Sequence, residues 1–253
     1  MRKIVVFDSG LGSLSIIRPI QKISKLEIIY FADQKNFPYG NKSKTQLRKI
    51  IQDRILMIDK KFNPDIIVLG SNTPSLLLKN IIKKNIVGIT PPLTKALNIS
   101  TTNNIGILAT QSVVRSKELS EFINKKKLSK DIKIIKINAS PLVNLVESGD
   151  FLANPKKCIK TIQKLLKHVI AKNQLDVITL SSTHLPFLRK YLEKEFPNVK
   201  FIDPGEEIAI LVRKKTKSKL KRNKLLIYTS SNPKNFQKQL SKIRIYNKVN
   251  FLP

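Results

Sequence analysis

The sequence predicts an α/β protein with two similar lobes, each built on a central, mainly parallel sheet flanked by helices. Three observations predict this class. Short continuous apolar runs are each followed by a polar turn and a helix-like pattern, which is typical of parallel sheets. This unit occurs three times in the first part of the chain and begins again near Thr94. The polar turns of the two halves also match, which indicates an approximate duplication with pseudo-twofold symmetry.

The first half opens with a buried strand over residues 4–7, which form a continuous apolar run. Turn residues follow, and a helix-like pattern begins at Leu14. Asp8, directly after the strand, has two interpretations, a helix cap or a ligand-binding carboxylate, and the pattern alone favours neither. Residues 28–32 predict the second strand and residues 45–62 an amphipathic helix.

The third strand is expected over residues 66–69, directly before the polar turn Gly70-Ser71-Asn72-Thr73. A helix is expected over residues 74–83, because a proline such as Pro74 suits the first position of a helix. Asn72 and Thr73 are therefore candidate caps as well as candidate ligand-binding residues.

The second half repeats this pattern. Residues 105–110 resemble residues 4–9, and residues 132–137 predict a further strand. A helix over residues 155–172 leads to an apolar run that ends in the polar turn Ser181-Ser182-Thr183-His184, which lines up with Gly70-Ser71-Asn72-Thr73. Open α/β sheets place ligands at the carboxyl ends of their strands. A ligand site in the cleft between the two lobes is therefore expected.

The last part of the chain is expected to return to the first lobe. Residues 225–229 predict the last strand and residues 233–243 a final helix. The basic run over residues 213–224 is interpreted as a solvated connection. The expected domains are residues 1–93 with 207–253, and residues 94–206.

Length and composition exclude several classes of protein. A chain of 253 residues with 41% hydrophobic and 26% charged residues is typical of a globular protein. No apolar run approaches the roughly 18 residues of a membrane span, so we expect a cytoplasmic protein without membrane contact. The only cysteine, Cys158, excludes an internal disulfide, and the two histidines, His168 and His184, are too few and too far apart to favour a zinc site. Neither a metal nor a cofactor is expected.

The net charge of +31 has two interpretations. So basic a surface would attract nucleic acid through sequence-independent electrostatics. Lysines are spread along the whole chain, however, and aromatic residues make up only 6%. The favoured interpretation is therefore a genome-wide enrichment of lysine, asparagine and isoleucine, unrelated to function. A non-specific nucleic-acid contact is the alternative, and we expect it at residues 213–224.

Six short motifs occur along the chain in a fixed order. They are Asp8-Ser9-Gly10, Pro38-Tyr39-Gly40, Ser71-Asn72-Thr73, the stretch 140–149 that contains Glu147, Ser182-Thr183-His184 and Asp203-Pro204-Gly205. Their sequences and order are similar to those of the cofactor-independent glutamate racemases, within the wider aspartate/glutamate racemase superfamily. The similarity covers nearly the whole chain.

The resemblance implies a two-base racemisation of glutamate, a small acidic amino acid, for peptidoglycan synthesis. In the family, one cysteine thiolate removes the α-proton while a second cysteine returns a proton on the opposite face. Ser71 and Ser182 occupy these two positions here, and the assisting roles would fall on Asp8, Glu147 and His184. The family's substrate-binding positions correspond to Ser9, Pro38, Tyr39, Gly40, Asn72, Thr73, Thr110 and Thr183. A homodimer is a further expectation.

Both thiols of the family are missing from this chain. A free cysteine titrates near 8.5, whereas a serine hydroxyl lies closer to the roughly 15.7 of water, so an alkoxide costs on the order of 9–10 kcal/mol more. A protein environment shifts a pKa by at most about 3–5 units. Very slow two-base catalysis is therefore expected of Ser71 and Ser182.

Two other functions stay open from the sequence. The first is a catalytically inactive homologue that binds an acidic amino acid or a nucleic-acid or topoisomerase partner, since some family members are associated with binding DNA gyrase. The second is another reaction on a small carboxylate, with Ser71 as nucleophile and His184 as base. That reaction requires a serine Oγ within about 3.2 Å of the imidazole.

Overall fold

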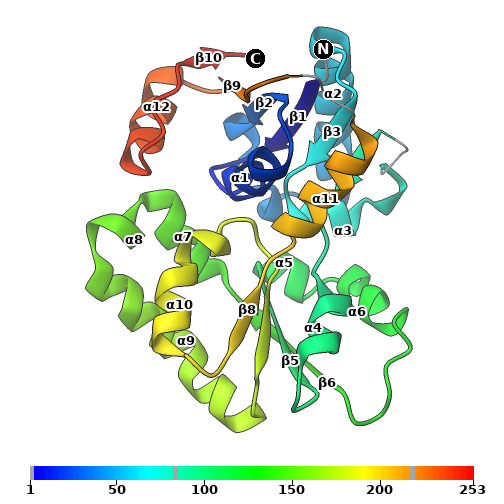
Figure 1. Cartoon of the computed structure of the whole chain (residues 1–253), viewed down its shortest axis with the longest axis vertical. Coiled ribbons are helices and arrows are strands. Elements are labelled where there is room, and N and C mark those ends of the chain that lie inside the picture. Colours follow the sequence, from blue (N-terminus) through cyan, green and yellow to red (C-terminus); the bar gives the residue numbers. More distant parts are fainter. Residues whose placement is uncertain (1–2, 82–84, 217–219) are drawn as a thin grey trace. The chain divides into compact units, whose positions relative to one another are not determined.

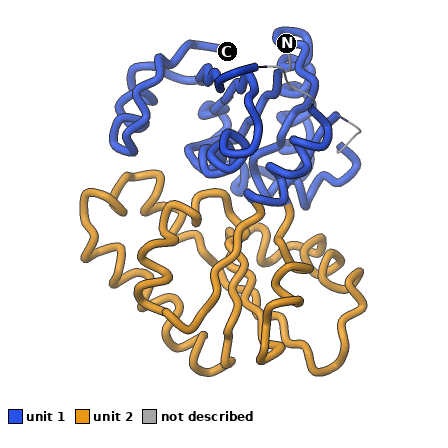
Figure 2. The backbone as a smooth tube through the Cα atoms, viewed as in Figure 1, with its two compact units in different colours: residues 1–89, 205–253 blue, residues 90–204 orange. Residues whose placement is uncertain are grey.

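The computed structural model describes residues 3–81, 85–216 and 220–253. The chain divides into two compact units, which Figure 2 distinguishes by colour. Unit 1 comprises Met1–Ile89 and Gly205–Pro253, and unit 2 comprises Thr90–Pro204. The chain therefore enters unit 2 at Thr90 and returns to unit 1 at Gly205.

Unit 1 is built on a six-stranded sheet with the order β10-β9-β2-β1-β3-β4, and each neighbouring pair is parallel. The strands are β1 (Lys3–Asp8), β2 (Glu27–Ala32), β3 (Ile66–Leu69), β4 (Ile86–Gly88), β9 (Lys224–Thr229) and β10 (Val249–Phe251). β1 lies between β2 and β3, so the strand order reverses there. Open sheets place ligands at the carboxyl ends of the strands at such a reversal.

The central strands of unit 1 are buried on both faces, which explains their continuous apolar sequences. Val5, Ile29 and Ile67 belong to a core with helix α2 (Lys44–Phe62). Each such side chain contributes about 1.5–3 kcal/mol when fully buried. Helix α2 begins at a capping box, in which Ser43 and Gln46 bond each other's backbone N–H groups.

Further helices of unit 1 complete its layers (Figure 1). Helices α1 (Leu14–Ile23) and α11 (Gly205–Lys215) pack against each other, and α12 (Pro233–Lys242) reaches the sheet where the Phe236 ring meets that of Tyr30. The short elements are α3 (Asn72–Leu77) and the 3-10 helices η1 (Gln34–Asn36), η2 (Tyr39–Asn41) and η3 (Lys79–Ile81).

Unit 2 is built on a four-stranded parallel sheet with the order β6-β5-β7-β8. Its strands are β5 (Asn104–Ala109), β6 (Lys133–Asn138), β7 (Val177–Leu180) and β8 (Lys200–Ile202). This order repeats the arrangement β2-β1-β3-β4 of unit 1, strand for strand. The predicted fold class, with two parallel sheets flanked by helices, is confirmed.

Helices cover both faces of the unit 2 sheet (Figure 1). Residues of α4 (Leu93–Ile99) and α6 (Lys117–Asn124) form a core with Ile105 and Val177 on one face. Helices α9 (Pro155–Asn173) and α10 (Arg189–Glu195) lie on the other. The short elements are α5 (Gln111–Val114), α7 (Ser140–Ser148), α8 (Asp150–Ala153) and η4 (Leu185–Leu188).

The partly buried carboxylate of Asp176 fixes the start of β7. Asp176 accepts hydrogen bonds from the side chains of Ser100, Thr101 and Thr102, at 2.6–2.9 Å, and from two backbone N–H groups of the same segment. Partial burial alone would raise the pKa of Asp176, but these hydrogen bonds outweigh it and lower the pKa to about 2. The loop between α4 and β5 is thereby tied to the neighbouring strand.

Some expected element bounds are wrong. The helix expected over 74–83 begins at Asn72 and ends at Leu77, with Ser71 as its N-cap, and residues 82–84 lie outside the described part. Asn72 and Thr73 are therefore helical residues and not caps. Pro74 stands third in the helix, where its missing N–H costs nothing because first-turn N–H groups have no partner within a helix.

The C-terminal part also differs from expectation. Arg213–Lys215 of the expected basic connection form the last turn of α11, where cations suit the helix dipole, and Lys224 begins β9; residues 217–219 lie outside the described part. One more strand, β10, follows the strand expected to be last. Across the described residues, no helix has the length and apolar character that a membrane crossing requires.

Candidate active site

The first part of the candidate site lies at the carboxyl end of β1. Asp8 is 1% exposed, and its Oδ1 accepts a hydrogen bond of 2.7 Å from the backbone N–H of Ser9. The buried Tyr30 hydroxyl donates to the carbonyl of Gly10 and fixes the turn. Helix α1 has Ser13 as its N-cap, so the interpretation of Asp8 as a helix cap is wrong.

The second part lies at the carboxyl end of β3, the strand beside β1. The N–H of Gly70 donates to the carbonyl of Phe7 at 2.7 Å, which holds this turn against β1. A Cβ at Gly70 would lie 2.4 Å from the Cβ of Ser13, so only glycine fits here. Ser71 follows in an extended conformation, and its side chain does not cap α3.

The side chain of Asn72 gives the clearest sign of a ligand. It is 4% exposed, and neither Oδ1 nor Nδ2 has a hydrogen-bond partner within the described part of the chain. A buried polar group left unpaired costs about 1–3 kcal/mol, and such groups are normally paired. A ligand with both donors and acceptors, such as an amino acid, would satisfy both ends of this amide.

The Pro38-Tyr39-Gly40 turn lies next to α3, since η2 and α3 are in contact. Tyr39 is 2% exposed, and its hydroxyl donates to Oδ2 of Asp33 at 3.1 Å. Burial raises the pKa of Tyr39 well above its usual value, and the charges of Asp33 and Asp8 raise it further. Tyr39 is therefore a neutral phenol at physiological pH.

Unit 2 repeats the arrangement of the turn. The N–H of Ser181 donates to the carbonyl of Leu108 on the neighbouring strand β5 at 2.9 Å. This bond corresponds to the one from Gly70 to Phe7 in unit 1. Ser182 and Thr183 follow, both buried. Thr110, at the end of the neighbouring strand β5, is the N-cap of α5, and its hydroxyl lies 3.2 Å from that of Ser112.

Three side chains of unit 2 form a hydrogen-bonded series, which we call the Ser182 relay. Oγ of Ser182 lies 3.4 Å from Nδ1 of His184, and Nε2 of His184 lies 2.5 Å from Oε1 of Glu147 on α7. A carboxylate accepts the Nε2 proton, which leaves Nδ1 as the acceptor facing the Ser182 hydroxyl. His184 can thus act as a base for Ser182, although 3.4 Å is longer than the reach of about 3.2 Å typical of such pairs.

The structure groups the expected site residues within each unit. Unit 1 holds Asp8, Ser9, Pro38, Tyr39, Gly40, Ser71, Asn72 and Thr73, and unit 2 holds Thr110, Glu147, Ser182, Thr183 and His184. Sequence reasoning missed Asp33, which directly follows β2 just as Asp8 ends β1. Its position after an apolar run was the signal that could have found it.

Two other features bear on the chemistry. Cys158 is fully buried in α9, and burial raises the pKa of its thiol to about 11, so it is an inert structural cysteine. Within the residues that the structure describes, no three His, Cys, Asp or Glu side chains gather in a way that could hold a metal ion.

The chain belongs structurally to the α/β proteins with two parallel-sheet units, each with polar turns at the carboxyl ends of its central strands, the edge where open sheets place ligands. The chain matches no protein-family model. It is 34% identical over 216 residues to a glutamate racemase of Actinobacillus pleuropneumoniae, a match that covers 81% of this chain and 78% of the relative. The chain belongs to the glutamate racemase family.

Solved structures show the same fold. Glutamate racemase isoform RacE1 from Bacillus anthracis superimposes with a TM-score of 0.84 at 22% identity, covering 100% of this chain and 97% of that one. Escherichia coli glutamate racemase, in complex with L-glutamate and the activator UDP-MurNAc-ala, gives a TM-score of 0.83 at 21% identity, covering 99% and 98%.

Proposed function

We propose that the chain interconverts L- and D-glutamate without a cofactor, the reaction that provides D-glutamate for peptidoglycan synthesis. Its membership of the glutamate racemase family supports the reaction class. The observation that carries the proposal is the Ser182 relay, because it gives one of the two expected proton-carrying positions a base held by a carboxylate.

In this proposal the two serines act on opposite faces of the α-carbon. As Ser182 Oγ removes the α-proton, its own proton passes to Nδ1 of His184, while Glu147 stabilises the resulting imidazolium. The Ser71 hydroxyl then gives its proton to the other face of the carbanion and is left as an alkoxide, while Ser182 already carries the former α-proton. Water takes the extra proton from His184 and returns a proton to Ser71, which restores the starting state. Reaction of the other enantiomer runs in the opposite direction, with Asp8 assisting Ser71.

The proposed ligand-binding groups suit glutamate. Asn72 offers a buried amide with unused donors and acceptors, and Thr73, Thr110 and Thr183 offer hydroxyl groups. Asp8 offers a negative charge for the ammonium group. We assign Ser9 and the Pro38-Tyr39-Gly40 turn to the same ligand by their correspondence with the family's motifs.

The two serines lower the proposed rate. The histidine base recovers part of the cost of the alkoxide, since general-base catalysis contributes typically about 10²- to 10⁴-fold. A pKa gap of several units remains after this gain. We therefore infer slow racemisation compared with enzymes that carry thiols.

A second candidate function is binding of glutamate without turnover. The replacement of both thiols favours it. Ser71 and Ser182 are small and polar like cysteine, but they lack the thiols that would act as the two bases toward the α-proton. This candidate differs from the first only in the fate of the α-proton, so one assay separates them.

The test is uptake of deuterium at the α-carbon of L- and D-glutamate in heavy water, followed by proton NMR, with calorimetry of glutamate binding on the same preparation. Exchange above the rate in buffer supports the racemase. Binding without exchange supports the second candidate. Neither binding nor exchange, for glutamate or aspartate, contradicts both.

We also propose a weak, non-specific contact with nucleic acid, supported by the net charge of +31 and by Arg213, Lys214 and Lys215 in the last turn of α11. A gel shift whose affinity falls steeply with salt is the expected result, and no shift near physiological salt contradicts it. A homodimer stays a prediction, which sedimentation velocity tests.

A further inference from the structure

We propose that Asp33 is a positioning residue that holds the Pro38-Tyr39-Gly40 turn in the conformation that binds the ligand. The C-terminal return of the chain, which is the part of unit 1 from Gly205 to Pro253, completes this support through Ser230. The proposal deepens the proposed function and rests on it for the identity of the ligand, glutamate. The anchoring of Tyr39 itself is independent of any ligand.

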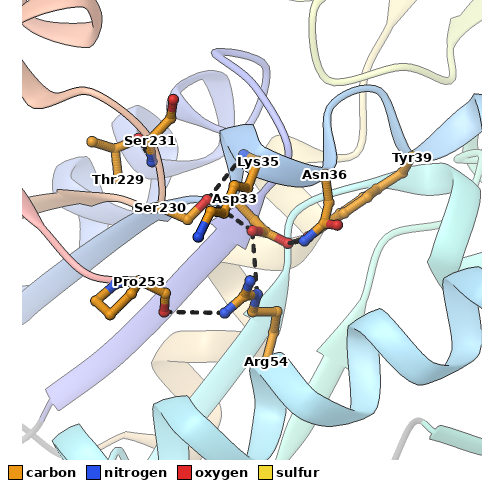
Figure 3. Close-up of polar contacts among 9 residues, drawn as sticks. All are labelled: Asp33, Lys35, Asn36, Tyr39, Arg54, Thr229, Ser230, Ser231 and Pro253. Carbon is orange, nitrogen blue, oxygen red and sulfur yellow. Dashed lines mark hydrogen bonds and ion pairs between the residues drawn. The ribbon is translucent and has the colours of Figure 1, made fainter.

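Asp33 sits between two parts of the candidate site. It directly follows β2, its side chain is fully buried, and its backbone N–H donates to the carbonyl of Asp8 at 2.7 Å. Its carboxylate lies among side chains from four separate segments of unit 1 (Figure 3). A buried carboxylate is costly unless all its oxygens are paired.

Among the described residues, the partners of the Asp33 carboxylate are all hydrogen-bond donors. Oδ2 accepts from the Tyr39 hydroxyl at 3.1 Å and from Nδ2 of Asn36 at 2.8 Å. Oδ1 accepts from the Ser230 hydroxyl at 2.9 Å and lies 3.2 Å from Nε of Arg54. An ionised carboxylate only accepts hydrogen bonds, so these four contacts use both oxygens fully.

The direction of the Tyr39 hydrogen bond follows from this pairing. A carboxylate cannot donate, so the Tyr39 hydroxyl must give its proton to Asp33. Because a phenol has only two side-chain torsions, an anchored hydroxyl at one end and a buried ring in the middle leave little freedom for the backbone of the turn. Asp33 thereby limits where Pro38 and Gly40 can lie.

The C-terminal return holds Asp33 from the other side. Ser230 follows β9, its N–H donates to the carbonyl of Ala32 at 3.0 Å, and its Oγ also accepts from the N–H of Lys35 at 3.0 Å. Arg54 joins the same network, because its NH1 donates to the carbonyl of Pro253 at 3.1 Å (Figure 3). Residues almost 200 positions away in the chain therefore support the Tyr39 turn.

A simple structural ion pair is the alternative role for Asp33. The pair with Arg54 would stabilise unit 1 whatever happened at Tyr39. The two roles differ in one respect, since only a positioning residue changes the environment of Tyr39 and the affinity for ligand together. The experiment therefore needs one readout of Tyr39 and one of binding.

The variants are Asp33→Asn, Ser230→Ala, Tyr39→Phe and the double variant Asp33→Asn/Tyr39→Phe. Ser231→Ala is the matched control, because Ser231 is the next residue and its side chain is not a partner of Asp33. Ser230→Ala keeps the charge of Asp33 and its other three donors, so it tests the proposal even if Asp33→Asn does not fold.

Calorimetric titration with L-glutamate gives the binding readout. We expect the Kd to rise about tenfold in Asp33→Asn and in Tyr39→Phe, and less in Ser230→Ala, with no change in Ser231→Ala. The double variant should bind no more weakly than Asp33→Asn alone, because both changes break the same support. Additive effects, or an unchanged Kd in Asp33→Asn, would overturn the proposal.

Fluorine NMR of fluorotyrosine-labelled protein, without ligand, gives the second readout. The Tyr39 resonance is identified by its absence in Tyr39→Phe, and we expect it to shift in Asp33→Asn and Ser230→Ala but not in Ser231→Ala. An unmoved resonance in Ser230→Ala overturns the anchoring. If the wild type binds no glutamate while the resonance shifts as expected, the proposed function fails and the anchoring stands.

Discussion

The turns after β3 and β7 share a backbone arrangement but differ in what surrounds their serines. Each begins with a backbone N–H that bonds the carbonyl of the neighbouring central strand, at 2.7 Å from Gly70 and 2.9 Å from Ser181. Ser182 then meets His184, which Glu147 holds. Ser71 instead precedes Asn72, whose buried amide has no partner in the described chain.

We infer that the turns after β3 and β7 have different roles in the proposed reaction. In the proposed reaction, the turn of unit 2 supplies the groups that move a proton, and the turn of unit 1 supplies the Asn72 amide, which a ligand can pair. The same strand order positions both, because each serine follows the strand beside the first strand of its sheet.

The largest effect is expected from a thiol in one turn only. Ser182→Cys should raise deuterium exchange of one enantiomer of glutamate by about 10²- to 10⁴-fold, because a thiol with a histidine base ionises far more readily than a serine. Ser71→Cys should do so for the other enantiomer, and by less, since its proposed assistant is the carboxylate of Asp8 and not a histidine held by a carboxylate as at Ser182. Separate proton NMR assays with L- and D-glutamate measure both rates. An equal rise in the exchange rate of both enantiomers in either single variant would contradict the different roles proposed for the two turns.

The relay itself is tested in the background of Ser71→Cys/Ser182→Cys, where rates are measurable. We expect His184→Ala to lower the exchange rate by about 10²-fold, as for loss of a general base, and Glu147→Gln to lower it less. Glu193→Gln is the matched control, since that carboxylate pairs with Arg189 on the surface of the same unit. An effect of Glu193→Gln as large as that of Glu147→Gln would show a general loss of charge instead.

Asn72 should matter for the ligand and not for folding. Asn72→Ala removes an unpaired buried amide, so we expect glutamate binding to weaken about tenfold while the free energy of unfolding stays equal or rises by up to about 1 kcal/mol. Asn154→Ala is the opposite case, because Asn154 caps α9 by accepting from the N–H of Lys157 at 3.0 Å. That variant should lose about 1 kcal/mol of stability and keep its affinity. Calorimetry and urea denaturation measure both quantities.

The smallest effect on activity is expected at the start of β7. Asp176 has a pKa of about 2 in the folded protein, below its ordinary 3.8, so its stabilisation is fully present above pH 3.8 and is lost as the pH falls through about 2. Asp176→Asn should lower the Tm at neutral pH and leave ligand binding unchanged, and the difference from wild type should shrink toward pH 2. Glu121→Gln, in an exposed pair with Lys117, is the control and should change the Tm little.

The sequence predicted the strands and polar turns well because buried parallel strands are continuous apolar runs. Asp8, Ser71 and Ser182 were predicted as candidate site residues for this reason, and the structure places each at or just after the end of a strand. Bounds failed where the local signal was weak. Strand β10 has only three residues with a polar one at its centre, and α3 begins at Asn72, with Ser71 in the N-cap position but without a side-chain cap.

The support of the site could not be predicted from the sequence. Asp33 meets Arg54 and Ser230, which no periodic pattern connects to it. The unpaired state of Asn72 is likewise a property of three-dimensional packing, since its sequence neighbours alone cannot tell whether its amide is buried. Side-chain pairing between distant segments is the information that only the fold supplies.

In the proposed reaction, Ser71 and Ser182 limit the rate because they stand in the positions of two thiols. Deuterium exchange into glutamate, measured side by side for the wild type and for Ser71→Cys/Ser182→Cys, tests it most directly. We predict slow exchange in the wild type, exchange faster by at least about 10²-fold in the double variant, and the same Kd for glutamate in both. A double variant that binds glutamate and exchanges no faster than the wild type would contradict the account.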